Sequence, residues 1–300
     1  MRPSALVALA LLACAAACGR ARVPPPGPPV ASTCAPAGRW IDPSTGFAVP
    51  FQEVVAGAAA ARIVLLGEDH DDPAVHRWQL HTIAAIAGTV PVALGLEMLP
   101  RRAQPALDRW VAGVTTRETF LAESDWRRTW GFDPDLYWPI LDFARMHRTP
   151  VVALNVERSL VGRVAAVGWA NVPSDAREGV STPAPASPAY RDALSQAWHA
   201  HAGSHDDPAA FERFVEAQLT WDRAMAEALR DAVAANPGRT VAALLGRGHV
   251  EHGFGVPAQL AALGETPPRV LVAWQPARDC AQLVPGVADA VFGLDGALDE

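Results

Sequence analysis

Polar side chains that could do chemistry follow four short apolar runs of the chain. The first run leads into Glu68 and His70, the second into Glu97, the third ends in Asn155, and the fourth leads into His249. Two carboxylates and two imidazoles in one site suit metal ligation with an open position, or general acid–base hydrolysis. We therefore take Glu68, His70, Glu97 and His249 as candidate catalytic and metal-ligating residues. Glu68 would be the general base, and His249 a metal ligand or an acid on the oxyanion side.

The elements that must position these residues alternate along the chain. Apolar runs predict strands at 62–67, 90–96, 150–155, 240–246 and 269–274. Longer amphipathic stretches predict helices at 72–87, 104–112, 135–147, 159–166, 211–234 and 257–263. This pattern predicts an α/β fold, with a mostly parallel central sheet flanked by helices. Ligands bind outside the carboxyl ends of such strands, so we expect the candidate residues to meet in one crevice.

The connection between the third and fourth predicted strands is longer than a crossover needs. We expect it to add a helical subdomain at about 156–238. On its long helix, 211–234, Gln218 and either Trp221 or Asp222 fall on one stripe with apolar residues. Core packing would explain the apolar members of this stripe, but not the amide or the carboxylate.

Each candidate carboxylate also has a structural alternative. Glu68 and Asp72 could cap the helix that follows them. Glu97 follows a buried strand and needs a partner, which Arg101 or Arg102 could supply. The histidine two residues after Glu68 could be an ordinary loop residue.

The N-terminal segment is typical of an export signal. Residues 1–17 have one early cation followed by an apolar run too short to span a bilayer, and we predict a lipoprotein signal peptide. The length of the run favours Cys18 as the lipidated residue, whereas a leucine three positions earlier favours Cys14. Residues 18–60 are predicted to form a Pro-rich tether and an N-terminal arm, attached to the membrane through the lipid.

Cleavage before Cys18 would leave an even pair of cysteines, Cys34 and Cys280. Exported proteins reach an oxidising compartment, so this pair could form a disulfide between the arm and the last part of the domain. Two free thiols are the alternative.

The composition excludes several classes of function. The net charge of -7 argues against nucleic acid as a partner, because phosphates need a basic footprint. All 25 cations are Arg, which excludes Schiff-base and P-loop lysine chemistry. The chain has no HExxH, GxSxG or Walker A motif, so serine-based acyl transfer has no support.

Seven short motifs occur in an order that resembles the ChaN-like haem-binding uptake lipoproteins. They are Gly67-Glu68-Asp69-His70, His76 with Gln79, Leu96-Glu97-Met98, Tyr137, Ala153-Leu154-Asn155, Glu216 to Ala226, and Gly246-Arg247-Gly248-His249. The similarity covers about 60–275, and this family looks related to a group containing the erythromycin esterases and the Tiki and TraB proteins.

The resemblance implies a ChaN-like α/β domain over 61–300 and haem or iron acquisition. It also implies a lipoprotein of the bacterial cell envelope, at the periplasmic face of the outer membrane. Because the chain lacks Lys, a haem propionate would contact an arginine such as Arg101, Arg102 or Arg247.

The resemblance leaves the haem ligand open. Haem iron accepts Tyr or His as an axial ligand, so Tyr137, His249 and His70 are the candidates. The candidate cofactor-binding residues are Tyr137, Asn155, Gln218, Trp221 and His249.

Some members of the wider group are hydrolases, and Tiki proteins are metal-dependent. The alternative function is therefore a metal-dependent or acid–base hydrolase that uses the crevice of Glu68, His70, Glu97 and His249. A divalent metal, enzymatic activity and a homodimer remain alternatives. The expected partner is haem or another small molecule.

Overall fold

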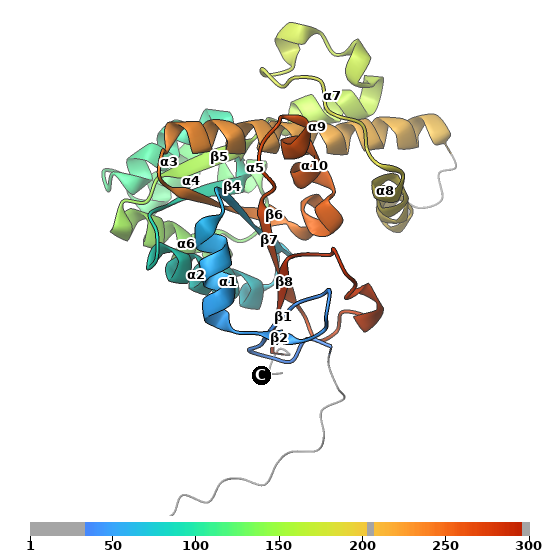
Figure 1. Ribbon diagram of the computed structural model, residues 1–300. Helices are drawn as coiled ribbons and strands as arrows, with labels where there is room; N and C mark the ends of the chain where they lie inside the picture. The colour runs from blue at the N-terminus through green and yellow to red at the C-terminus, as the bar shows by residue number, and fades with distance from the viewer. Residues whose placement is uncertain (1–33, 203–206, 296–300) are drawn as a thin grey trace, which may run out of the picture. The chain divides into compact units, whose positions relative to one another are not determined.

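A computed structural model describes residues 34–202 and 207–295 (Figure 1). Cys14, Cys18, the predicted signal peptide and most of the predicted tether lie outside the described residues. Within them, no helix is long and apolar enough to cross a membrane.

The described residues form one sheet of eight strands in the order β2-β1-β8-β7-β3-β6-β4-β5. The strands are β1 (Trp40–Ile41), β2 (Ala48–Val49), β3 (Ile63–Glu68), β4 (Val92–Pro100), β5 (Val151–Asn155), β6 (Thr240–Gly246), β7 (Arg269–Trp274) and β8 (Ala290–Gly293). From β8 to β5 every neighbouring pair is parallel, and β1 and β2 add an antiparallel edge. The predicted α/β fold with a mostly parallel sheet is confirmed.

Helices cover both faces of this sheet (Figure 1). They are α1 (Phe51–Ala60), α2 (Pro73–Ala87), α3 (Gln104–Val111), α4 (Arg117–Ser124), α5 (Trp126–Thr129), α6 (Pro134–His147), α7 (Arg158–Val167), α8 (Pro188–Ala202), α9 (Pro208–Ala235) and α10 (Gly255–Ala262). Helices α1–α6 pack on one face, against residues such as Leu66 and Leu94. Helices α9 and α10 pack on the other, against Leu65 and Leu245. Because side chains alternate along a strand, adjacent leucines of β3 serve opposite faces.

The region 156–238 shows why a separate helical portion is expected there. Helix α9 is 28 residues long. Residues from its first half pack in small clusters with α7 and α8, whereas Met225 and Leu229 pack on the sheet. One helix therefore carries side chains from the sheet out to the added helices.

The five strands predicted from the sequence correspond to β3–β7, within a few residues at each end. The sequence did not indicate β1, β2, β8, α1, α4, α5 and α8. Strands of two residues, such as β1 and β2, are too short to show a period. The predicted tether and arm, 18–60, also differs from the structure at its end. Its last part supplies β1, β2 and α1 and is continuous with the α/β domain.

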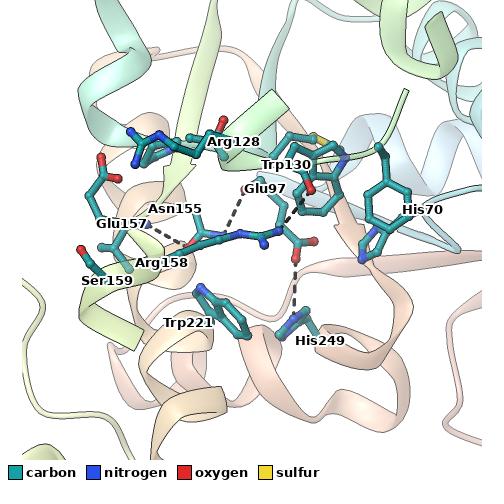
Figure 2. Close-up of a pocket in the computed structure, with 15 residues that line it drawn as sticks. His70, Glu97, Arg128, Trp130, Asn155, Glu157, Arg158, Ser159, Trp221 and His249 are labelled. Carbon is teal, nitrogen blue, oxygen red and sulfur yellow. Dashed lines mark hydrogen bonds and ion pairs between the residues drawn. The ribbon is translucent and has the colours of Figure 1, made fainter. Parts of the chain in front are cut away.

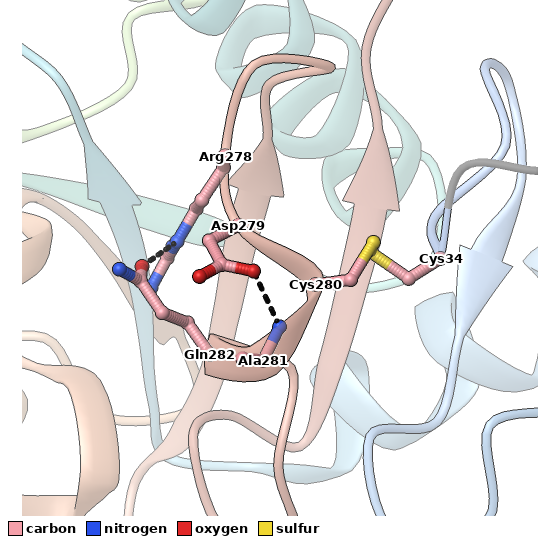
Figure 3. Close-up of a disulfide and its surroundings, with 6 residues drawn as sticks. All are labelled: Cys34, Arg278, Asp279, Cys280, Ala281 and Gln282. Atoms are coloured by element: carbon pink, nitrogen blue, oxygen red, sulfur yellow. Dashed lines mark hydrogen bonds between the residues drawn. A yellow bond between two sulfur atoms is a disulfide. The ribbon is translucent and has the colours of Figure 1, made fainter. Parts of the chain in front are cut away.

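Cys34 and Cys280 are joined by a disulfide, with Cα atoms 5.6 Å apart (Figure 3). It connects the start of the described chain to a short 3-10 helix, Cys280–Gln282, after β7. The cysteines are 246 positions apart in sequence. Cross-linking so long a loop restricts the unfolded chain and stabilises the fold by up to about 5 kcal/mol.

Candidate functional site

The carboxyl ends of the central strands bring the candidate residues together. Glu68 ends β3 and is paired in register with Gly246, which ends β6. The register of β4 against β5 shifts between Leu96 and Pro100, and Glu97 lies in this irregularity. Irregularities of this kind re-aim side chains near functional sites.

A cavity of about 240 Å³ lies at this edge of the sheet (Figure 2). Three of the four predicted catalytic residues line it: His70, Glu97 and His249. Asn155 and Trp221 line it as well. Apolar side chains complete much of the wall, including Met98, Pro100, Trp130, Phe132 and Val156.

The first histidine belongs to a set of three side chains that we call the Glu68 triad: Tyr137, Glu68 and His70. The Tyr137 hydroxyl donates to Glu68 Oε1 at 2.7 Å, and His70 Nδ1 lies 2.9 Å from the same oxygen. The other carboxylate oxygen accepts from the amide of Gln79 at 2.8 Å. The side chain of Glu68 is fully buried, so it acts behind His70 and is not a helix cap. Asp72 is the cap, accepting from the backbone N–H of Ala74.

The second histidine belongs to a matching set, the Asp222 triad: Tyr190, Asp222 and His249. The Tyr190 hydroxyl donates to Asp222 Oδ2 at 2.8 Å, and His249 Nδ1 lies 2.6 Å from Oδ1. Asp222 is fully buried. The chain has two tyrosines, and each donates to a buried carboxylate that holds a histidine.

Glu97 lies between the two histidines. Its Oε2 accepts from the backbone N–H of Gly246 at 2.5 Å, and its Oε1 lies 3.6 Å from His249 Nε2. A Cβ atom on Gly246 would lie 2.9 Å from Cε1 of His70 and 3.6 Å from Oε2 of Glu97. The close approach of these three residues therefore requires glycine at this position. Arg101 and Arg102 do not pair with Glu97.

The charges around His249 favour its protonated form. Burial by itself would lower the pKa of His249, but the charges of Asp222 and Glu97 and the hydrogen bond to Asp222 raise it to about 9. At neutral pH the ring is therefore an imidazolium, which donates from Nδ1 to Asp222 and directs Nε2–H toward Glu97.

The pKa of His70 is also raised. Burial opposes this change, and the hydrogen bond to Glu68 with the charges of Glu97 and Glu68 outweighs it, while His249 acts in the opposite direction. Burial and the adjacent carboxylates raise the pKa of Tyr137 and Tyr190, which keeps both hydroxyls protonated as donors.

Two of the predicted cofactor-binding residues are not at the cavity. Tyr137 is only 2% exposed, and its hydroxyl is used by Glu68. Gln218 is not among the lining residues. Asn155, by contrast, lines the cavity and donates to the backbone carbonyl of Glu97 at 3.1 Å.

The arginines expected near a propionate are used inside the protein. Arg101 donates to the carbonyl of Ala224, Arg102 is paired with Glu157, and Arg247 is paired with Asp69 at 2.8 Å. None of the three arginines lines the cavity. Arg128 and Arg158 line it instead.

The prediction of a divalent metal at Glu68, His70, Glu97 and His249 is not supported. Within 34–202 and 207–295, no three His, Cys, Asp or Glu side chains are grouped so that they could hold a metal ion. The reason is physical. The oxygens of Glu68 accept from Tyr137, Gln79 and His70, and His249 is protonated, whereas metal ligands must be deprotonated.

Sequence reasoning missed part of the site. Asp222 was considered only as an alternative to Trp221, and Tyr190 received no role. The available signal was an acidic residue on an otherwise apolar helical stripe, which a buried partner must satisfy. Nothing in the sequence indicated that α8 would bring Tyr190 to it.

These features define an α/β protein with a carboxylate–imidazole site at the carboxyl edge of its sheet. The model of a family described as "Haem-binding uptake, Tiki superfamily, ChaN" matches residues 54–260. This match spans more than half of the chain, and the chain belongs to that family. The resemblance given by the motifs is confirmed.

Solved structures show the same fold. A structure of cofacial haem binding to ChaN of Campylobacter jejuni is 18% identical, with a TM-score of 0.67 over 84% of this chain and 95% of that one. The type III effector HopBA1 is 14% identical, with a TM-score of 0.46 over 81% of this chain and 92% of that one. The erythromycin esterase EreC, a mutant in its open conformation, is 15% identical, with a TM-score of 0.44 over 79% and 77%. No curated protein matches the chain.

Proposed function

We propose that this protein binds haem in the cavity of Figure 2, with His70 as the axial ligand of the iron. The observation that carries this proposal is the state of the His70 ring. Its Nδ1 is held by Glu68, its side chain is 29% exposed, and it lines the cavity. Within the described residues its Nε2 has no hydrogen-bond partner. A histidine whose other nitrogen is fixed by a carboxylate is a common arrangement for binding a metal.

The other two candidate ligands fit less well. His249 is protonated at neutral pH, and Tyr137 is buried with its hydroxyl bonded to Glu68. An axial ligand must offer a lone pair at the cavity. His70 is therefore the ligand that requires the smallest rearrangement.

The walls suit a flat, mostly apolar molecule. The ring of Trp130 meets the ring of His70 edge-on, with centroids 4.6 Å apart, and Phe132 lies 5.3 Å from His70. At about 240 Å³, the cavity is smaller than most ligand pockets, which are roughly 300–1,000 Å³. We infer that it covers one face of the macrocycle and leaves the other face exposed. Cofacial binding, as named for the Campylobacter relative, would cover that face in a homodimer.

A haemin titration of the domain tests the proposal. The wild-type protein should shift the Soret band at a stoichiometry of one haem per chain, and His70→Ala should abolish this shift or change its position. His147→Ala is the matched control, because His147 is exposed on α6 and does not line the cavity. Absence of a shift in wild type would contradict haem binding, and an unchanged shift in His70→Ala would exclude that ligand alone.

We further propose that the chain is an exported lipoprotein that acts in iron uptake at the periplasmic face of the outer membrane. The apolar segment before Cys18 supports this proposal, as does the disulfide, which is typical of oxidising compartments. Labelling with a fatty acid in a bacterial host tests the anchor. Cys18→Ser should lose the label and the membrane fraction, whereas Cys14→Ser should retain both. The opposite result would move the lipid to Cys14.

A second candidate function is acid–base hydrolysis without a metal, favoured by the position of Glu97. This carboxylate lies beside a protonated His249, so one group could accept a proton and the other donate one. Hydrolysis of a panel of aryl esters tests this candidate. Activity that is lost in Glu97→Gln and retained in His147→Ala would support it, and no turnover of any ester by wild type would count against it.

A further inference from the structure

We propose that Arg158, assisted by Arg128, forms a carboxylate-binding subsite at the cavity, which selects flat ligands that carry peripheral carboxylates. This inference rests on the proposed haem-binding function and names the part of the ligand that is recognised. The sequence pointed to other arginines for this task, so the assignment comes from the structure alone.

Arg158 is placed to meet a ligand in the cavity. It is the first residue of α7, and its side chain reaches across the cavity toward Trp130 on the opposite wall (Figure 2). There its Nη2 donates to the backbone carbonyl of Trp130 at 3.1 Å. In the part of the chain that the structure describes, Arg158 makes no ion pair with an acidic residue.

This situation differs from that of the neighbouring arginines. Arg101, Arg102 and Arg247 are each close to an acidic side chain, with Glu227, Glu157 and Asp69 as their respective partners. A guanidinium has five N–H donors, and the neutral carbonyl of Trp130 engages Arg158 without compensating its charge. A ligand carboxylate could replace this carbonyl with two parallel charged hydrogen bonds.

The carboxylate inside the cavity does not take this place. Glu97 accepts from the backbone N–H of Gly246 and lies beside the imidazolium of His249. Its charge is therefore already compensated from the protein side. The charge of Arg158 remains available to a ligand.

Arg128 supplies a second cation on the same cavity. It lies on α5 and lines the cavity, and its Nε donates to Asp125 at 2.5 Å. Its side chain is 73% exposed, so a ligand can reach the rest of the guanidinium. Apolar walls with two arginines match a planar ring system with two acidic groups on its edge, as in a porphyrin with two propionates.

The experiment compares haemin with haemin dimethyl ester, in which both propionates are blocked. Each is titrated, in the same detergent, into wild type, Arg158→Gln and Arg163→Gln. Arg163 is the matched control, because it is an exposed arginine on α7 that does not line the cavity. We expect wild type and Arg163→Gln to bind haemin about tenfold or more tightly than the ester. Arg158→Gln should bind both ligands alike, at the affinity of the ester, with an unchanged Soret position.

The outcomes separate this inference from the proposed function. Equal affinity of wild type for haemin and its ester, or an equal loss of both in Arg158→Gln, would overturn the subsite and leave haem binding intact. Failure of wild type to bind either compound would overturn haem binding itself, and the subsite with it. A change in the Soret position in Arg158→Gln would show that this residue acts through the axial ligand, which also contradicts the proposal.

Discussion

The two triads are built from the same kinds of side chains but in different ways. In the Glu68 triad, the carboxylate and the histidine are two residues apart on one strand end, and only the tyrosine comes from elsewhere. In the Asp222 triad, α8, α9 and the segment after β6 each supply one residue. The Glu68 triad therefore depends mainly on local chain geometry, whereas the Asp222 triad exists only if the added helices pack correctly.

The triads also differ in charge and exposure. The side chain of His249 is 14% exposed and the ring is protonated, whereas that of His70 is 29% exposed with Nε2 directed at the cavity. We infer that the Asp222 triad holds a fixed positive charge beside Glu97, and that the Glu68 triad presents a nitrogen to the ligand. The predictions below test whether this division holds.

Removing the carboxylates should give the largest effect. Asp222→Asn leaves the buried His249 without its charge partner and should lower the free energy of unfolding by about 3–5 kcal/mol. The pKa of His249 should fall below its ordinary value, because burial is then opposed only by Glu97. Glu68→Gln should cost less, about 1–2 kcal/mol, because His70 is more exposed.

Urea unfolding, together with NMR titration of the histidine rings, measures both effects. Equal costs, or an unchanged pKa of His249 in Asp222→Asn, would contradict the division between the triads. Asp192→Asn on α8 is a suitable control, because this residue is exposed and outside both triads.

Alkaline pH should act on one triad more than on the other. The pKa of His249 is raised from 6.5 to about 9 in the folded protein, so its protonated form stabilises the fold. This contribution of about 3 kcal/mol is fully present below pH 6.5 and is lost as the pH rises through 9. The charged or titratable groups that set this pKa are Asp222, Glu97 and His70.

Unfolding free energies measured at several pH values between 6 and 9.5 test this sign. Wild type and His70→Gln should both lose stability over this range, and His249→Gln should show a nearly flat profile. A flat profile in wild type would show that His249 is neutral and would make it a second candidate for the axial ligand.

The two tyrosines should give the smallest effects. Tyr190→Phe leaves Asp222 Oδ2 without a donor and should cost about 2 kcal/mol. Tyr137→Phe should cost about 1 kcal/mol, because Glu68 still accepts from His70 and Gln79. Urea unfolding of the matched pair measures the difference, and a larger cost for Tyr137→Phe would reverse the comparison.

Part of this site could be predicted from the sequence, for a physical reason. Parallel strands place their carboxyl ends at one edge, so strand boundaries were sufficient to bring together His70, Glu97, Asn155 and His249. Periodicity gives no information about which side chain will reach a given hydrogen-bond partner. Tyr137 was therefore expected to contact a ligand, although the structure buries it behind Glu68.

The amino-acid sequence by itself determined the α/β alternation, the sheet edge that carries the site and the family of the chain, because these depend on local hydrophobic patterns and short motifs. The tertiary structure alone decided that Asp222 and Tyr190 hold His249, and that Arg158 lies across the cavity while other arginines pair elsewhere. Such choices depend on which donors and acceptors lie within about 3 Å of each other after the helices have packed, and no local pattern encodes that distance.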